Sequence, residues 1–375
     1  MTPSRRSFLK VGLASAPAAG LPLAMPGSQR AARGSGLGIP GPYPGRVVSV
    51  YHPGGIIGRQ YQREPVRRMI HKGMVELTGA DAVEESWRRF FEPGDVVGIK
   101  VNPVGKPFVI SAPEVLQELI AGLGMAGVPH RDIVVYDRYR QEFLEAGFDK
   151  WLPDGVRWTA GTDKPHPLQL DMDGYDPDQY METALVLPAA NPDDPHHRRS
   201  YVAKWLTRGV NKVINLCVLK HHQSAGVTLA LKNMSHGMVN NVSRSHSTST
   251  LNTCGTFIPA VVDLPVIRQK VVLHILDGIQ GAYHGGPQRK VEKYMWNHQT
   301  MYFATDPVAV DRIGWKVIDS KRAEMGMPPV GRAKPDEDST YYRMQPEHIE
   351  IAGALGLGVF DENKIDERRF RLTSL

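Results

Sequence analysis

The stretch DVVGIKVNPVGKPFVISAPEVLQELIAGLGMAGVPHRDIVVYD, residues 95–137, decides the fold. It begins and ends with short runs rich in β-branched residues, 95–101 and 132–137, which are typical of buried strands. Between them, 111–127 has helical periodicity, and Ser111 is the expected helix cap. A strand, a helix and a second strand in this order form a crossover connection, so the sequence predicts a sheet that is at least partly parallel.

Strand and helix patterns alternate on both sides of this stretch. A strand is expected at 47–52, and helices are expected between residues 60 and 91. The later strands are expected at 212–219, 270–279 and 300–305, and the later helices at 201–208, 226–235, 257–267, 306–326 and 346–358. This pattern predicts an α/β protein with a mostly parallel sheet flanked by helices.

Three regions fall outside this alternation. Segment 151–200 is rich in Pro and Asp and lacks sustained periodicity, so we expect an irregular excursion over the surface, or a lid. Residues 34–46 are expected to form a linker, and 361–375 a C-terminal tail. The α/β domain itself is therefore expected to span 47–360.

The first 33 residues resemble a twin-arginine export signal with its processing region. Arg5 and Arg6 precede a mildly apolar run without charge, from Val11 to Met25. An ordinary basic tail is the alternative interpretation. A stable membrane anchor is not expected, because Pro17 and other breakers interrupt a run that is too short to span a bilayer. The signal predicts export by the twin-arginine translocase, to the periplasm or out of the cell.

The export signal changes how the net charge is interpreted. The formal net charge is +6, but five basic residues and no acidic residue precede position 34, so a processed chain carries +1. Such a chain lacks the strong excess of positive charge that nucleic-acid binding requires, and no nucleic-acid partner is expected.

The chain has two cysteines, Cys217 and Cys254, and both lie in sequences typical of a protein interior. An oxidising compartment permits a disulfide between them, although two buried free thiols are the simpler interpretation. Two cysteines fall short of the four thiolates that usually hold an iron–sulfur cluster, so no such cluster is expected.

The most unusual stretch is LCVLKHHQSAGVTLALKNMSHG, residues 216–237, which places lysines and histidines in an apolar run. The preceding residues predict a central parallel strand whose carboxyl end delivers Lys220, His221 and His222. In open α/β sheets, ligands bind just beyond the carboxyl ends of the strands. These three side chains are therefore candidates for a binding site.

The helix that follows this strand supports the same site. Thr228, Lys232 and His236 recur every four residues and share one stripe of a helix that is otherwise apolar. Because a buried lysine is costly without a counter-charge, this stripe is expected to face a polar cavity. The alternative is that Lys232 pairs with an internal acid such as Asp277 and that the histidines are hydrogen-bonded core residues.

These groups together predict a pocket for a carboxylate or phosphate. The backbone amides and positive dipole of the helix start near Gly226 favour an anion, and Lys220 and Lys232 would supply charge. The candidate catalytic residues are His221, His222, Lys232 and Asp277, and the candidate substrate-binding residues are Lys100, Asn102, Lys220, Thr228 and Asn233. An imidazole exchanges protons near neutral pH while a cationic clamp holds the substrate.

A transition metal is an alternative occupant of this region. His222, His236 and His246 offer imidazole ligands that suit zinc, nickel or copper, with His221 as a substitute for His222. The spacing matches no tight metal-binding motif, so the identity of a cofactor stays open.

Several segments resemble the family named domain of unknown function 362. The resemblance extends over roughly 47–360 and is carried by VGIKVNPVG, SAPEVLQELI, VINLCVLKHHQSAGVTLALKNMSHG, ILDGIQGAYHGGP and TDPVAVDRIGWKVI. Many members of that family carry a ferredoxin-like cysteine cluster, which this chain lacks. The family is also distantly similar to nickel-dependent lactate racemase, whose cofactor-tethering lysine would fall on Lys232 and whose histidine on His221 or His222. The glycine pair before that lysine is missing, because Leu229-Ala230-Leu231 occupies the position.

Three functions are compatible with these features. The first is an exported enzyme that acts on a small anionic substrate, with a racemase-like or oxidoreductase-like reaction. The second is a periplasmic binding protein for a metal or an organic anion, without catalysis. The third is an assembly factor of the cell envelope, which requires a large exposed apolar patch. We expect the first, because apolar walls with convergent polar groups are typical of enzyme pockets.

Overall fold

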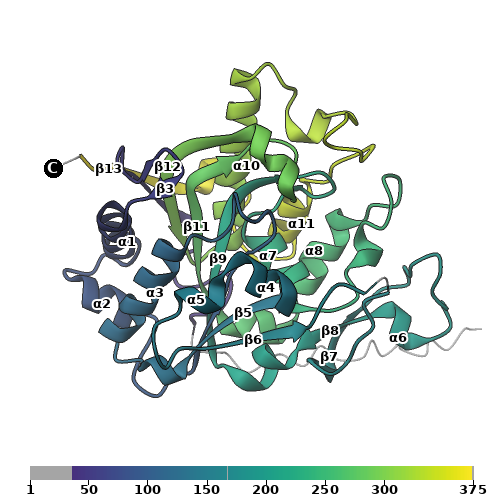
Figure 1. Ribbon diagram of the computed structural model, residues 1–375, viewed down its shortest axis with the longest axis horizontal. Coiled ribbons are helices and arrows are strands. Elements are labelled where there is room, and N and C mark those ends of the chain that lie inside the picture. Colours follow the sequence, from purple (N-terminus) through teal and green to yellow (C-terminus); the bar gives the residue numbers. More distant parts are fainter. Residues whose placement is uncertain (1–35, 167, 374–375) are drawn as a thin grey trace, which may run out of the picture. The chain divides into compact units, whose positions relative to one another are not determined.

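The computed structural model describes residues 36–166 and 168–373, so the predicted export signal lies outside the described residues. An eight-strand path forms the main sheet, in the order β13-β1-β12-β11-β9-β4-β5-β6 (Figure 1). The strands of this path are β1 (Arg46–Tyr51), β4 (Val97–Lys100), β5 (Ile133–Tyr139), β6 (Arg157–Thr162), β9 (Lys212–His222), β11 (Val271–Ala282), β12 (Met295–Ala304) and β13 (Asp366–Arg371). The short strand β10 (Gly226–Val227) pairs with the end of β9.

The sheet is mostly parallel, as the sequence predicts. Strands β11, β9, β4, β5 and β6 pair in parallel with one another. Strand β12 runs antiparallel to both β11 and β1, whereas β13 is parallel to β1. Strand β9 is buried along nearly its whole length, which is why its sequence is apolar at consecutive positions instead of alternating.

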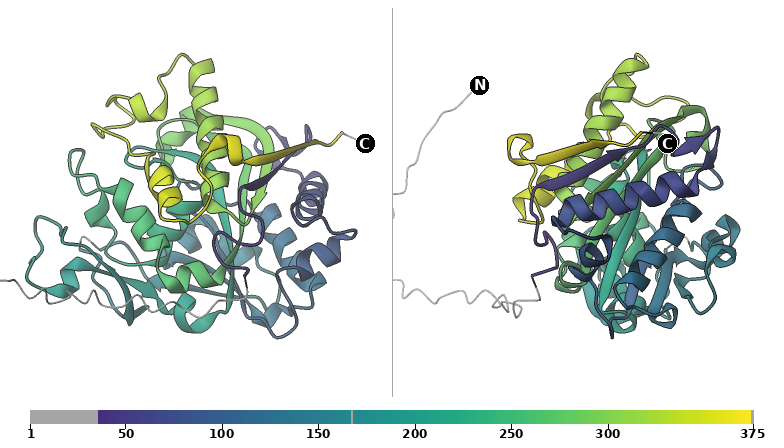
Figure 2. Two further views of the ribbon diagram at one scale, coloured as in Figure 1. Left: turned by 180° about the vertical axis from the view of Figure 1, so that it is seen from behind. Right: turned by 90° about the vertical axis from the view of Figure 1, so that its left-hand side faces the viewer.

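Helices cover both faces of the sheet (Figures 1 and 2). One apolar core joins the sheet to the first group of helices, which are α1 (Arg63–Thr78), α2 (Val83–Arg88), α3 (Pro113–Met125), α4 (Arg140–Ala146) and α5 (Phe148–Trp151). A second core joins it to the later helices, which are α7 (Leu229–Met238), α8 (Cys254–Val262), α9 (Pro265–Lys270), α10 (Pro307–Glu324) and α11 (His348–Ala354). The protein is therefore a layered α/β structure.

The predicted excursion is more regular than expected. Residues 157–162 form β6, which extends the main sheet, and β7 (Tyr175–Glu182) pairs with β8 (Arg199–Ala203) in a separate antiparallel sheet. The short helix α6 (Pro195–Arg198) lies between these two strands in the chain. The prediction of a helix at 201–208 is wrong for its first residues, because Tyr201 and Val202 belong to β8, which pairs with β7. A short π-helix, Trp205–Gly209, follows.

The expected C-terminal tail contains a strand of the main sheet. Residues 366–371 form β13, whose pairing with β1 places it at the sheet edge. Its sequence DERRFR is charged because an edge strand faces solvent, and its one large apolar residue, Phe370, packs against the core. The sequence did not predict β13, because its charged residues hide the alternation of apolar and polar side chains that is typical of a strand.

Ser111 does not cap α3. The helix begins after Ala112, and the hydroxyl group of Ser111 donates to the carbonyl oxygen of Leu216 while it accepts from the backbone N–H of Asn102. Ser111 therefore ties the segment that leaves β4 to the neighbouring strand β9.

Within the described residues, the structure has no helix that is both long and apolar enough to cross a membrane.

Candidate functional site

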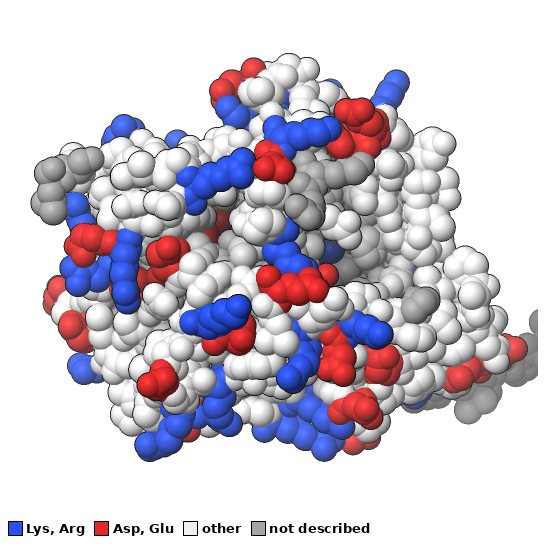
Figure 3. Space-filling view, viewed as in Figure 1, with Lys and Arg blue, Asp and Glu red and all other residues white. Residues whose placement is uncertain are grey.

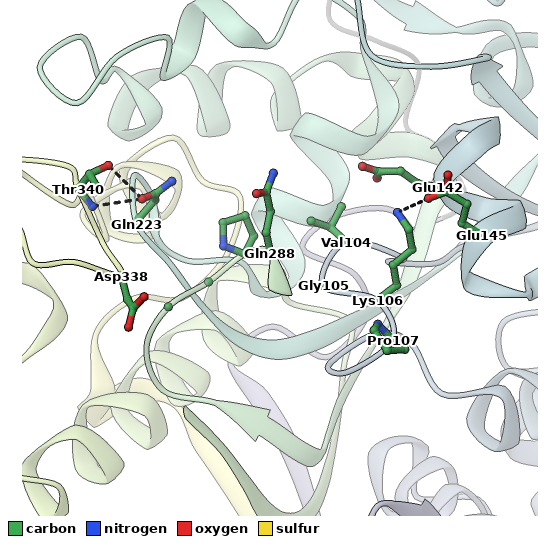
Figure 4. Close-up of a pocket in the computed structure, with 13 residues that line it drawn as sticks. Val104, Gly105, Lys106, Pro107, Glu142, Glu145, Gln223, Gln288, Asp338 and Thr340 are labelled. Carbon is green, nitrogen blue, oxygen red and sulfur yellow. Dashed lines mark hydrogen bonds and ion pairs between the residues drawn. The ribbon is translucent and has the colours of Figure 1, made fainter. Parts of the chain in front are cut away.

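Two adjoining hollows lie where strands β4, β5 and β9 end. The inner cavity has a volume of about 540 Å³ and includes Lys100, Lys220 and Lys232 in its wall. The outer cleft, shown in Figure 4, has a volume of about 750 Å³. The two hollows share Val104, Glu142, Gln223, Pro287 and Gln288. The two hollows therefore adjoin each other at the carboxyl ends of the strands, where ligands are expected.

Strand β9 directs alternate side chains to opposite faces of the sheet. Lys220 and His222 both line the inner cavity, whereas His221 does not. Nε2 of His221 lies 3.3 Å from the sulfur of Met344, its Nδ1 accepts from the backbone N–H of Gly286, and its ring packs on His284. His221 is therefore a packed core residue. Because side chains alternate along β9, His222 is the one of these two histidines that faces the cavity.

Lys232 is the most unusual group in the cavity. It extends from α7 into the hollow and is only 7% exposed. In the part of the chain that the structure describes, its ammonium nitrogen Nζ has no hydrogen bond and no ion pair, and Asp277 is not its partner. Burial lowers the pKa of Lys232 to about 8. An ammonium group that is buried in a cavity wall and has no partner among the described residues favours the binding of an anion.

The two other lysines of the cavity are held by neighbours. Nζ of Lys100 lies 2.6 Å from Oδ1 of Asp137, in an ion pair that is almost fully buried. Lys220 donates to Oδ1 of Asn102 and to the carbonyl oxygens of Val104 and Val109. It has no acidic partner among the described residues, and burial together with Lys232 lowers its pKa to about 7.

Two asparagines connect these lysines. Oδ1 of Asn233 accepts from the amide of Asn102 at 3.1 Å and lies 3.4 Å from Nζ of Lys100. The amide of Asn233 donates in turn to Asn215 on β9. Lys100, Asn102, Lys220 and Asn233 therefore form one buried polar network, which fixes the positions of the predicted binding residues.

The start of α7 is not free to bind an anion. Oδ1 and Oδ2 of Asp311 accept from the backbone N–H groups of Ala230 and Leu231, at 2.7 and 2.9 Å. The expectation that the helix amides near Gly226 hold a ligand is therefore wrong, because a carboxyl group of the protein occupies them. Thr228 does line the cavity, and its buried hydroxyl oxygen has no hydrogen-bond partner within the described residues.

Three histidines line the wall around Lys232. The rings of His222 and His246 are 5.6 Å apart between centroids, and those of His236 and His246 are 5.1 Å apart. Burial lowers the pKa of His222 well below its ordinary value, so the ring is neutral at pH 7. Its Nδ1 faces the backbone N–H groups of Ser224 and Ala225, which assigns the ring proton to Nε2. His222 is therefore a hydrogen-bond donor.

Asp277 lies outside both hollows. Its Oδ1 accepts from the hydroxyl group of Tyr61 and the backbone N–H of Ile279, and Oδ2 faces the backbone N–H of Ala112 at the start of α3. Burial raises the pKa of Asp277 to about 7. The carboxyl group has a role in holding β11 to α3, and its place in the structure does not suit the predicted catalytic role.

Sequence reasoning gave no role to two charged residues of the cavity wall. Glu142 extends from α4 toward Val104 (Figure 4), and its buried Oε2 has no hydrogen-bond partner in the described part of the chain. Burial and the nearby Asp137 raise its pKa. Arg138 directly follows Asp137 on β5 and donates to the carbonyl oxygen of His236. Arg138 lies near the carboxyl end of β5, where ligands bind in open α/β sheets, and Glu142 lies four residues further on.

The cavity concentrates positive charge. Its wall contains four cationic side chains and two acidic ones, which are Lys100, Arg138, Lys220, Lys232, Asp137 and Glu142. On the face shown in Figure 3, acidic and basic side chains are instead interspersed. The wall of the inner cavity thus has an excess of cationic side chains, and its chemistry suits a small anion.

Comparisons with known proteins give a family without an assigned activity. No curated protein matches the chain. A crystal structure of a protein from Thermotoga maritima is 12% identical, with a TM-score of 0.36, over 60% of this chain and 52% of that chain. This likeness covers only about half of that protein and carries no argument about function. Residues 97–316, which contain most of the cavity wall, match the family described as Domain of unknown function (DUF362). The chain therefore belongs to the DUF362 family.

Proposed function

We propose that this protein is an enzyme that binds a small anion, such as a carboxylate or a phosphate ester, in the inner cavity. The observation that supports the proposal is Lys232, an ammonium group buried in a 540 Å³ cavity with no acidic partner among the described residues. Burying a charge without a partner is unfavourable, so the free protein is poised to gain free energy when an anion enters.

The neighbours of Lys232 supply the remaining recognition. His222 offers Nε2–H, and Thr228 offers a hydroxyl group that lacks a partner in the described structure. Lys220 adds charge from the end of β9. An anionic group of the substrate would lie among these donors, of which Lys220 is held by Asn102 and His222 by the backbone N–H groups of Ser224 and Ala225. Preorganised donors of this kind bind charge without paying for reorganisation.

Glu142 is the group best suited to move a proton. It lines both the cavity and the cleft, so its carboxyl group borders the space in which the substrate would lie. A carboxyl group whose pKa is raised by burial exchanges protons closer to neutral pH than an ordinary glutamate does. We propose that Glu142 removes or returns a proton of the bound substrate while Lys232 holds its anionic group.

Binding and turnover are tested separately. Sulfate is a suitable binding probe because it does not titrate near neutral pH, and calorimetry measures its affinity for wild type, Lys232→Met and Glu142→Gln. Lys150→Met is the matched control, because Lys150 is exposed on α5. We expect Lys232→Met to abolish binding, whereas Glu142→Gln and the control retain it. Unchanged sulfate affinity in Lys232→Met would overturn the proposal.

Turnover is measured by NMR as exchange of carbon-bound hydrogen with D₂O, in a panel of 2-hydroxy, 2-oxo and 2-amino acids. An enzyme that moves a proton at carbon exchanges at least one of these substrates, and Glu142→Gln stops exchange while it leaves binding intact. Binding without exchange in wild type would instead support a periplasmic binding protein. These outcomes therefore decide between the two functions.

We also propose that the chain is exported by the twin-arginine pathway, on the strength of Arg5 and Arg6 in the sequence. The test is fractionation of cells that express wild type or a variant with both arginines changed to lysine. Periplasmic wild type and cytoplasmic variant support export. Equal distribution of the two proteins would contradict it.

A further inference from the structure

Three metal-ligating side chains meet beside the inner cavity. His236, His246 and Cys254 each offer one ligand atom, and these atoms all lie within 4.8 Å of one another. They come from separate elements: His236 from α7, Cys254 from the first position of α8, and His246 from the residue after the 3₁₀ helix Ser243–Ser245. Convergence from three elements of the chain is a property of the tertiary fold.

The loop that carries His246 is anchored. The buried guanidinium group of Arg244 donates to the hydroxyl group of Thr183, to the hydroxyl group of Ser200 and to the carbonyl oxygen of Asn241. The backbone N–H of Thr253, just before Cys254, donates to the carbonyl oxygen of Ser245 at 2.7 Å. These bonds hold the ligand-bearing segments at a fixed separation, as a preformed site requires.

Ser245 also orients the two imidazoles. Its hydroxyl oxygen lies 2.8 Å from Nε2 of His236 and 2.9 Å from Nδ1 of His246. Sγ of Cys254 lies 3.9 Å from the carbonyl oxygen of the same serine. Both rings and the thiol therefore surround one residue, and hydrogen bonds of this kind commonly fix the ring orientation of metal-binding histidines.

We propose that His236, His246 and Cys254 bind a divalent transition-metal ion of the zinc type. Two imidazoles and one thiolate match the nitrogen and sulfur ligands that zinc and cobalt prefer, while carboxylate-loving magnesium and calcium are disfavoured. Binding releases the thiol proton, so the ion and the thiolate together leave one positive charge. His222 is not a ligand, because its lone-pair nitrogen Nδ1 faces backbone amides.

Three protein ligands leave a coordination position open, as in catalytic zinc sites. His236 and His246 both line the inner cavity, so an ion held by them would lie at the wall of the cavity that contains Lys232. This part of the inference rests on the proposed function: the anionic group of the substrate would bridge the metal ion and the ammonium group. The ion would add to the positive charge of the cavity that attracts the anion.

Cobalt(II) is the probe, because a thiolate ligand gives it an intense charge-transfer band in the near ultraviolet. The full-length chain is freed of metal with a chelator and titrated with CoCl₂, and bound metal is counted by elemental analysis. Cys254→Ser removes the thiolate, and His246→Gln removes one imidazole. Cys217→Ser is the matched control, because Cys217 is also a buried free thiol but lies on β9 outside the cluster.

We expect one cobalt ion per chain with the thiolate band in wild type and in Cys217→Ser, and no band in Cys254→Ser. His246→Gln should weaken binding by more than the roughly 10–100-fold that is lost when a residue hydrogen-bonded to a metal ligand is removed. Absence of the band in wild type, or its persistence in Cys254→Ser, would overturn the inference. Circular dichroism of each metal-free variant shows whether it is folded, and a misfolded Cys254→Ser leaves His246→Gln to decide.

Sulfate binding to the metal-free protein separates this inference from the proposed function. If metal-free protein binds sulfate through Lys232 but wild type takes up no cobalt, the metal site is wrong and the anion site stands. If cobalt binds with its thiolate band but sulfate does not bind, the metal site stands and the proposed function fails.

Discussion

Asp311 lies 2.7 Å from the backbone nitrogen of Ala230, so a carboxyl group from α10 closes the first turn of α7. Its other oxygen accepts from the backbone N–H of Leu231. Leu229, which precedes Ala230, has a φ of 43°, in the left-handed region that residues other than glycine rarely adopt. Asp311 therefore stabilises a strained turn, and that turn places Thr228 and Lys232 in the cavity wall.

Replacing Asp311 with alanine should destabilise the protein. The change leaves two buried N–H groups of α7 without partners, which costs about 2 kcal/mol or more of unfolding free energy. Guanidinium unfolding followed by circular dichroism measures the loss. Asp81→Ala is the control, because Asp81 is exposed and should change stability by less than about 0.5 kcal/mol. Equal stability of the two variants would show that Asp311 does not hold the turn.

Two glycines of α3 should respond in opposite ways to alanine. A methyl group at Gly122 would lie 2.1 Å from the ring of Trp87, whereas one at Gly124 meets nothing within 4 Å. Gly124→Ala should therefore gain up to about 1 kcal/mol through helix propensity. Gly122→Ala should lose about 1–3 kcal/mol or more, because the fully buried Trp87 has no room to move. Thermal unfolding of both variants checks the contrast, and a stabilised Gly122→Ala would contradict the packing.

The central strands were predictable because burial leaves a clear signature in the sequence. Strand β9 is apolar on both faces, and β4, α3 and β5 follow one another with the periods of a crossover. Periodicity was uninformative for β8 and β13. In both, pairing with a neighbouring strand decides the structure, and in β13 charge hides the strand pattern. Long-range pairing is not encoded in a local window of sequence.

The site was predictable where a local rule applies. The strand-end rule selects Lys100, Lys220 and His222, and the helical period selects Lys232; all four line the inner cavity. The same rule also selects Asp277, but its carboxyl group points to the start of α3. The partnership of Asp311 with α7 was not predictable, since the two elements are about eighty residues apart in the chain. Tertiary packing decides which strand-end residues face a hollow.

Asp277 should make stability depend on pH. Burial raises its pKa from 3.8 to about 7, so between these values the folded protein binds a proton that the unfolded chain releases. Stability should therefore fall as the pH rises from about 4 to about 7, by up to about 4 kcal/mol from this group. Asp277→Asn removes the titration and should flatten this part of the profile. Denaturant unfolding at several pH values measures both profiles, and identical slopes would refute the assignment.

Lys232→Met should stabilise the unliganded protein at pH 7. Burial lowers the pKa of Lys232 from 10.5 to about 8, so the folded state disfavours the charged form. Below pH 8 the unfavourable contribution is largest, and it declines as the pH rises toward 10.5. Removing the amine should add up to about 3 kcal/mol of unfolding free energy at pH 7. Denaturant unfolding of wild type and Lys232→Met at pH 7 and pH 10 measures the difference, which should shrink at pH 10.

Sulfate affinity should decrease as the pH rises. In the unliganded cavity Lys220 and Lys232 have pKa values of about 7 and about 8, so each loses its positive charge above those values. Sulfate then binds only with uptake of a proton, and its affinity should fall by up to about tenfold per pH unit for each lysine that has lost its charge. Calorimetry between pH 6 and pH 9 measures this slope.

Buffers with different ionisation enthalpies give an independent measure of the same linkage. If the lysines bind the anion, the number of protons taken up with sulfate should rise from near zero at pH 6 as the pH passes the two pKa values. Glu142→Gln should retain sulfate binding, because both lysines remain in the cavity wall. An affinity that stays constant from pH 6 to pH 9, without proton uptake, would mean that sulfate binds away from Lys220 and Lys232, because no anion can hold these amines charged at pH 9 without taking up protons.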